Sequence, residues 1–141
     1  MADMSWKECI DKKIIFKIPP DLERAKQMEK TADLRYEFWD MKIKEKFSSL
    51  KVEAYYEIIR DLIFAHLYKN GFNCTNHLCL ISFLKENFED FDFEIEKIDE
   101  LRKVRNDFDY RGFVVNKEYL EKNEIEFKHI IKELKKRFGE K

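Results

Sequence analysis

The sequence predicts an all-α protein, an up-and-down bundle of four to five antiparallel helices. Three observations predict this class. Apolar residues recur at three- and four-residue steps along almost every segment, which is the period of an amphipathic helix. Only three glycines and two prolines occur in 141 residues, so turns are few and elements are long. Signals for strands are nearly absent, because residues 112–115 form the only β-like stretch and it is short.

The first part of the chain predicts one short helix and one long helix. Residues 4–16 form the short leading helix, which Pro19 and Pro20 end, so residues 1–20 are an N-terminal extension of a single domain spanning residues 1–141. Asp21 is expected to cap the next helix by accepting free amides of its first turn. That helix has its apolar residues on one face: Ala25, Met28, Ala32, Tyr36, Trp39 and Ile43.

Four further helices, the last of them at the C-terminal end, complete the predicted bundle. Residues 52–68 form a long helix that ends at Asn70 and Gly71, since both residue types tolerate a left-handed cap. Residues 76–88 form a shorter helix, and another begins near Phe93. The last helix begins at Asn116, a cap residue, and closes with basic residues that suit the negative end of the helix dipole.

Composition limits the classes of function. Hydrophobic residues make up 44% and charged residues 40%, which is typical of a folded domain. Apolar runs are far shorter than the roughly 20 residues of a membrane helix, and the N-terminus does not resemble a signal peptide. The three cysteines form no CxxC pair and are expected to be free thiols in a reducing compartment, so we expect a cytoplasmic protein with no membrane contact.

Net charge and aromatic content limit how the protein can contact RNA or a second copy of itself. The net charge is −1, so any contact with RNA requires a local basic patch. Aromatic residues are 15% of the chain, including 13 phenylalanines, and a small bundle has limited interior. Some aromatic side chains are therefore expected at the surface, lining the interface of a homodimer.

The most informative segment is residues 101–112. On a helix, Arg105 falls on the same stripe as Ile98, Leu101 and Phe108, where an apolar residue is expected. A guanidinium held at a half-buried helix surface is a good phosphate ligand. The alternative is an internal ion pair, in which Asp109, or Asp107 of a second copy, neutralises Arg105.

The other polar candidates favour structural roles. His66 lies on an apolar face and is expected to be a hydrogen-bonded core residue, while His77 is expected to anchor the start of its helix. Cys74, His77 and Cys79 form one ligand cluster where zinc needs two, and Glu126 with His129 gives one ExxH motif where a di-iron bundle needs two. We therefore expect no metal and no cofactor. The sequence also lacks the motifs of nucleotidyltransferases, kinases and hydrolases.

Two segments together resemble the HEPN superfamily (higher eukaryotes and prokaryotes nucleotide-binding). Residues 53–67, followed by Gly71 and His77, resemble its second long helix, the glycine stop and the histidine opening the next helix. Residues 101–110 resemble the arginine-led motif late in its fourth helix. The resemblance covers roughly residues 21–138.

The resemblance implies a helical homodimer. Many members are toxins of toxin–antitoxin modules beside a minimal nucleotidyltransferase, and active members are metal-independent endoribonucleases. Their composite site uses an arginine and, four to six residues later, a histidine from each subunit. Here Tyr110 stands in that histidine window after Arg105, and no histidine follows within six residues. The candidate catalytic residues are Arg105, Asp109 and Tyr110. The candidate phosphate- or nucleotide-binding residues are Arg102, Arg105, Asn106, Tyr56 and His77.

Three functions stay open from the sequence. The first is a HEPN protein that binds a nucleotide or RNA in a dimer cleft, partnered with a nucleotidyltransferase, without cleaving RNA. The second is a metal-independent endoribonuclease with a substituted acid–base residue, in which Asp109 serves if burial raises its pKa. The third is a helical adaptor with no small-molecule site. Whether the chain is an enzyme is left open.

Overall fold

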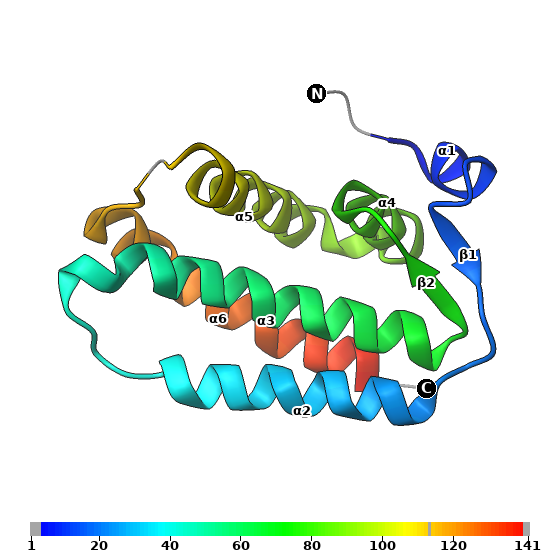
Figure 1. Ribbon diagram of the computed structural model, residues 1–141, viewed down its shortest axis with the longest axis horizontal. Helices are drawn as coiled ribbons and strands as arrows, with labels where there is room; N and C mark the ends of the chain where they lie inside the picture. Colours follow the sequence, from blue (N-terminus) through cyan, green and yellow to red (C-terminus); the bar gives the residue numbers. More distant parts are fainter. Residues whose placement is uncertain (1–3, 113, 140–141) are drawn as a thin grey trace.

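The computed structural model describes residues 4–112 and 114–139, and it is almost entirely helical. The elements follow in this order: α1 (Trp6–Asp11), β1 (Ile15–Lys17), α2 (Leu22–Trp39), the 3₁₀ turn η1 (Glu45–Phe47), α3 (Ser48–Lys69), β2 (Phe72–Cys74), α4 (His77–Asn87), the 3₁₀ turn η2 (Glu89–Phe91), α5 (Asp92–Arg111) and α6 (Lys117–Gly139). The four long helices alternate in direction along the chain (Figure 1). The predicted all-α class is confirmed.

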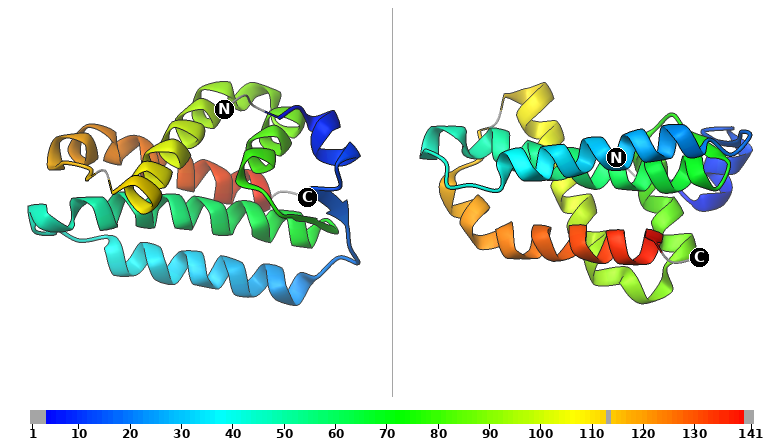
Figure 2. Two further views of the ribbon diagram at one scale, coloured as in Figure 1. Left: turned by 45° about the horizontal axis from the view of Figure 1, so that its top comes forward. Right: turned by 90° about the horizontal axis from the view of Figure 1, so that it is seen from below.

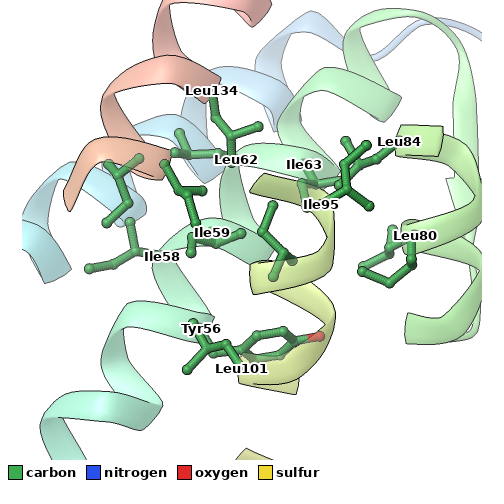
Figure 3. Packing of buried hydrophobic residues seen from close by; sticks show 14 of the residues in the cluster. Tyr56, Ile58, Ile59, Leu62, Ile63, Leu80, Leu84, Ile95, Leu101 and Leu134 are labelled. Atoms are coloured by element: carbon green, nitrogen blue, oxygen red, sulfur yellow. The ribbon is translucent and has the colours of Figure 1, made fainter. Parts of the chain in front are cut away.

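Helix α3 is the centre of the bundle. It packs against α2, α5 and α6, and most of its residues are buried. Helix α2 runs alongside α3, whereas α5 crosses it obliquely (Figure 2). Side chains from several helices meet in one core, in which Ile59 and Leu62 of α3 lie among Ile95, Leu101 and Leu134 (Figure 3). A helix buried on so many sides can carry polar residues only where hydrogen bonds or opposite charges satisfy them.

The two predicted N-caps, Asp21 and Asn116, are present, and the structure adds a third at Asn76. Asp21 accepts a hydrogen bond from the amide of Arg24, and Asn76 accepts one from the amide of Leu78. The side chain of Asn116 accepts one from the amide of Tyr119. These bonds satisfy amides that the first turn of a helix leaves without a partner.

The strand content differs from the sequence prediction. Val114 and Val115 form no strand, and Phe113 lies outside the described residues. The two strands of the described chain are β1 and β2, which pair antiparallel with Ile15 opposite Cys74. The leading helix is accordingly shorter than residues 4–16. Strand β1 forms where the backbone of β2, which follows α3, supplies its hydrogen-bond partners. The period of a single segment does not reveal a partner so far along the chain.

The second helix also ends earlier than its apolar face predicted. Helix α2 stops at Trp39, so Ile43 lies in the connection to α3. Lys51 donates to the carbonyl oxygen of Met41 at 2.7 Å and holds this connection against α3. A long-range contact therefore competes with continuation of the helix.

The prediction of free thiols is wrong for two of the three cysteines. Cys9 of α1 and Cys79 of α4 form a disulfide, and only Cys74 is free. Their sulfur atoms meet because α1 packs against α4, although 70 residues separate them in the sequence. The disulfide links the N-terminal extension covalently to the bundle.

The surface carries large apolar side chains, as the composition predicts. Phe38, Phe93 and Tyr110 are among those exposed. Within the described residues, no helix has the combination of length and apolar character that crossing a membrane requires.

Candidate functional site

Arg105 lies between two carboxylates at the contact of α5 with α3. Its Nη2 is 3.1 Å from Oε1 of Glu57, and its Nε is 3.0 Å from Oδ2 of Asp109. The side chain is only 14% exposed. Although Nε is close to Asp109, it is buried without an aligned hydrogen bond in the described part of the chain. The ion pair with Asp109 that the sequence offered as an alternative is therefore present, and phosphate binding by Arg105 stays a prediction.

Glu57 connects Arg105 to two more arginines. It also pairs with Arg60, one turn further along α3, and lies 3.8 Å from Arg35 of α2. Arg35 in turn is 2.5 Å from the buried carboxylate of Asp61. Burial raises the pKa of Asp61. These pairs form a continuous network that joins α2, α3 and α5.

Tyr56 and His77 form a hydrogen-bonded pair beside this network. The hydroxyl of Tyr56 and Nδ1 of His77 are 2.9 Å apart, and the guanidinium carbon of Arg105 lies 5.7 Å from the centre of the Tyr56 ring. Burial, followed by the charges of Arg60 and Arg105, lowers the pKa of His77. Burial also raises the pKa of Tyr56. Both side chains are therefore neutral at pH 7.

Arg102 is the third cation that acts on the Tyr56–His77 pair. It is buried, and its Nη2 is 2.8 Å from Oδ1 of Asp99. The charge of Arg102 acts on the pKa values of both Tyr56 and His77. We call Arg60, Arg102 and Arg105, together with Tyr56 and His77, the Arg105 cluster.

The structure thus brings together the residues predicted to bind phosphate. Arg102, Arg105, Tyr56 and His77 belong to the cluster, and Oδ1 of Asn106 is 3.5 Å from Nη1 of Arg105. Among the residues predicted to be catalytic, Asp109 contacts Arg105 directly, and Tyr110 is 77% exposed at the end of α5.

Sequence reasoning missed Glu53. A hydrogen bond with Asp109, then burial and the charge of Asp109, raise the pKa of Glu53 from 4.5 to about 7. The sequence assigns the substituted acid–base role to Asp109, whereas the group titrating near neutrality is its neighbour. Glu53, Glu57 and Arg60 follow one another at three- and four-residue steps, and this polar stripe on an otherwise buried helix is the signal that could have identified it.

The other candidates have structural partners. His66 stacks on Phe138 with ring centres 4.2 Å apart, and burial, followed by the charge of Lys69, lowers its pKa to about 4. Cys79 is held in the disulfide, and Nε2 of His129 lies 3.4 Å from Glu94. Within residues 4–112 and 114–139, no group of three or more potential ligands is arranged to hold a metal ion.

No family model, curated protein or solved structure has a significant match to this chain. The resemblance to the HEPN superfamily therefore depends on the two sequence segments alone. What the protein does must be inferred from the geometry of the Arg105 cluster.

Proposed function

We propose that this protein binds the phosphate groups of a nucleotide or of RNA at the Arg105 cluster. It acts as a homodimer of the HEPN type, in the cytoplasm, with a nucleotidyltransferase as its protein partner. The observation that carries the proposal is the convergence of three arginines on one neutral pair: Arg60, Arg102 and Arg105 all act on Tyr56 and His77. A guanidinium presents a fork of donors that matches phosphate oxygens, and a neutral tyrosine or histidine adds one more donor.

Phosphate must compete with the carboxylates that hold Arg105 in the isolated chain. The contact with Asp109 is the weaker obstacle, because Nε of Arg105 makes no aligned hydrogen bond to it in the described chain. Asp109 also lies in the last turns of α5, beside the exposed side chain of Tyr110. A phosphate that replaces Asp109 gains an unused buried donor, which favours exchange.

The exposed apolar residues near the end of α5 support the homodimer. Tyr110 and Val114 are both largely exposed, and they lie within nine residues of Arg105 along the chain. Burial of such side chains against a second copy would remove apolar surface from water and enclose the cluster.

A cytoplasmic location is compatible with the disulfide if the bond is protected from the reducing thiols of the cytosol. Disulfides are rare in the reducing cytosol of most cells, but they are common in intracellular proteins of hyperthermophiles. The Cys9–Cys79 bond is completely buried, so solvent thiols reach it only when α1 separates from α4.

Binding of a short RNA whose 2′-hydroxyls are methylated, and which therefore cannot be cleaved through them, tests the proposal. The Arg105→Ala variant should lose at least about tenfold in affinity, because a charge-assisted contact contributes about 1.5–3 kcal/mol. Lys103→Ala is the matched control: Lys103 lies on the same helix, but its side chain is mostly exposed. Equal affinity of Arg105→Ala and the unmodified protein, with the fold intact by circular dichroism, would contradict the proposal.

Glu53 favours a second function, cleavage of RNA. A carboxyl group whose pKa is about 7 can both accept and donate a proton at neutral pH, which is the role that the missing histidine leaves open. Arg105, in contact with Asp109, would stabilise charge on the scissile phosphate. Incubation with unmodified RNA tests this function. Glu53→Gln should abolish cleavage while binding of the methylated RNA persists, whereas cleavage that survives Glu53→Gln would reject it.

A further inference from the structure

A cavity of about 780 Å³ lies where the connection between α2 and α3 meets the beginning of α6. These segments come together at one end of the molecule (Figures 1 and 2). Small-molecule sites in proteins have volumes of about 300–1,000 Å³, so a ligand of nucleotide size fits. No residue of the Arg105 cluster lines this cavity, so it is a separate site.

A buried lysine lies at the cavity wall. Lys51 of α3 is only 4% exposed, and its Nζ is 2.8 Å from Oε2 of Glu124 and 2.7 Å from the carbonyl oxygen of Met41. An ammonium group has three N–H donors, and the third has no partner within the described residues. Burying a charge is costly unless it is paired, so the contacts with Glu124 and Met41 are needed to hold Lys51 in this position.

Glu124 and Tyr55 complete that arrangement. The hydroxyl of Tyr55 donates to Oε2 of Glu124 at 2.6 Å. Burial acts to raise the pKa of Glu124, but the hydrogen bonds from Lys51 and Tyr55 outweigh it and the pKa is lowered. The carboxylate therefore stays ionised at neutral pH and fixes the ammonium of Lys51 beside the cavity.

The charge balance of the cavity favours an anion. Five lysines and four carboxylates line it, whereas acidic residues outnumber basic ones in the whole chain. Lys117 and Lys128 pair with Glu121 and Asp40 at the surface.

Lys42 and Lys44 are the uncommitted cations of the cavity. Within residues 4–112 and 114–139, neither ammonium group makes an ion pair or a hydrogen bond. Both residues are exposed on the connection between α2 and α3. They can therefore contact an anion without first giving up another partner.

The remaining wall is apolar. Met41, Ile43 and Leu120 line the same cavity as the lysines. A ligand that joins an anionic group to a flat or aliphatic body would use both kinds of surface, whereas a free inorganic ion would use only one.

We infer that this cavity binds an organic phosphate of mononucleotide size. Lys42 and Lys44 contact the phosphate, Lys51 contributes its unused donor, and Met41, Ile43 and Leu120 pack against the organic part of the ligand. The site acts independently of the Arg105 cluster.

Titration calorimetry of the full chain with adenosine monophosphate tests this inference. The nucleotide should bind, and the Lys42→Gln/Lys44→Gln variant should lose at least about tenfold in affinity, since it removes both charged contacts of these lysines with the phosphate. Adenosine and inorganic phosphate should each bind more weakly, because each lacks one part of the ligand.

Two control variants distinguish binding in this cavity from binding elsewhere on the chain. Lys26→Gln/Lys30→Gln makes the same change in net charge on exposed positions of α2 that do not line the cavity, and it should leave the affinity within about twofold. The lysine variants are also compared in the Arg105→Ala background, which weakens any nucleotide binding at the Arg105 cluster: there too the remaining affinity should be lost on Lys42→Gln/Lys44→Gln and kept on Lys26→Gln/Lys30→Gln. Absence of nucleotide binding at millimolar concentration, equal loss in both lysine variants, or loss only in Arg105→Ala would overturn the inference. If inorganic phosphate bound as tightly as the nucleotide, the inference that the ligand has an organic part would be wrong.

Discussion

Nη2 of Arg105 lies 3.1 Å from Oε1 of Glu57, and this contact fastens α5 to α3 at the edge of the hydrophobic core. Glu57 is shared with Arg60 and Arg35, so one carboxylate serves cations from three helices. All of these charged groups are partly shielded from water. Removing any one of them therefore leaves an opposite charge without its partner, and water neutralises that charge only in part.

The first prediction concerns the stability of this contact. Arg105→Ala should lower the free energy of unfolding by about 1–2 kcal/mol, because Glu57 keeps its other arginines but loses one charge-assisted hydrogen bond. Urea unfolding followed by circular dichroism measures the loss. Lys103→Ala removes a pair between Lys103 and Asp99 in which the lysine is exposed, and it should change stability by no more than about 0.5 kcal/mol. Equal losses would mean that the contact with Glu57 contributes nothing specific.

The second prediction concerns the dependence of stability on pH. The pKa of Glu53 is about 7 in the folded chain and 4.5 as its ordinary value, so folding favours the protonated form. This group therefore contributes stability below pH 4.5, and the contribution is lost as the pH rises through 7. Around Glu53, the hydrogen bond to Asp109 and the charges of Asp109 and Glu57 oppose ionisation, while Arg105 favours it.

Glu53→Gln should remove that pH dependence. Its free energy of unfolding should fall less than that of the unmodified protein between pH 5.5 and pH 8, as measured in urea at both values. Glu37→Gln makes the same change in charge at an exposed position of α2 and should follow the unmodified protein. A parallel response of all three proteins would show that Glu53 ionises at its ordinary pKa.

The third prediction concerns the disulfide. The bond between Cys9 and Cys79 closes a loop with a sequence separation of 70 residues. Loss of such a constraint on the unfolded chain costs about 4 kcal/mol. Cys9→Ala/Cys79→Ala should therefore unfold at a much lower urea concentration, and dithiothreitol should lower the melting temperature of the unmodified protein but not of the double variant. Thiol titration in denaturant should count one free cysteine, Cys74. Three reactive thiols in the purified protein would refute the bond.

The fourth prediction separates backbone strain from a steric clash. Gly71 and Gly112 both have a positive φ, of 82° and 71°. A Cβ atom at Gly71 would lie 2.9 Å from the carbonyl oxygen of Ile18, whereas at Gly112 it would meet open space. Alanine in this region of φ costs about 1–2 kcal/mol at either position. Gly71→Ala should cost at least about 1 kcal/mol more, because the backbone at Ile18, the residue after β1, must move.

Thermal and urea unfolding of both glycine variants measures this difference. Gly139→Ala is a third comparison, since a Cβ there meets no neighbouring atom and the residue lies within α6. It should leave stability within about 0.5 kcal/mol. A smaller loss for Gly71→Ala than for Gly112→Ala would mean that the backbone at Ile18 moves aside at little cost.

Local patterns predicted the interior of each long helix and the caps Asp21 and Asn116, although not every helix end. Asp21, Asn76 and Asn116 act on amides two or three residues away, and the apolar period follows from the geometry of one helix. The motif of residues 101–110 also predicted Arg105 as a site residue. All of these signals are local, so they can be read without knowing how the helices pack.

Which groups meet depends on how the helices pack. Glu53 and Glu57 face Arg105 across 48 or more residues of sequence, Cys9 reaches Cys79, and Lys51 holds Met41 where the chain leaves α2. The physical reason is that a pKa shift, a disulfide or a cavity depends on burial and on charges brought close by packing. The period of a single helix gives the direction of a side chain but not the atoms that it will contact.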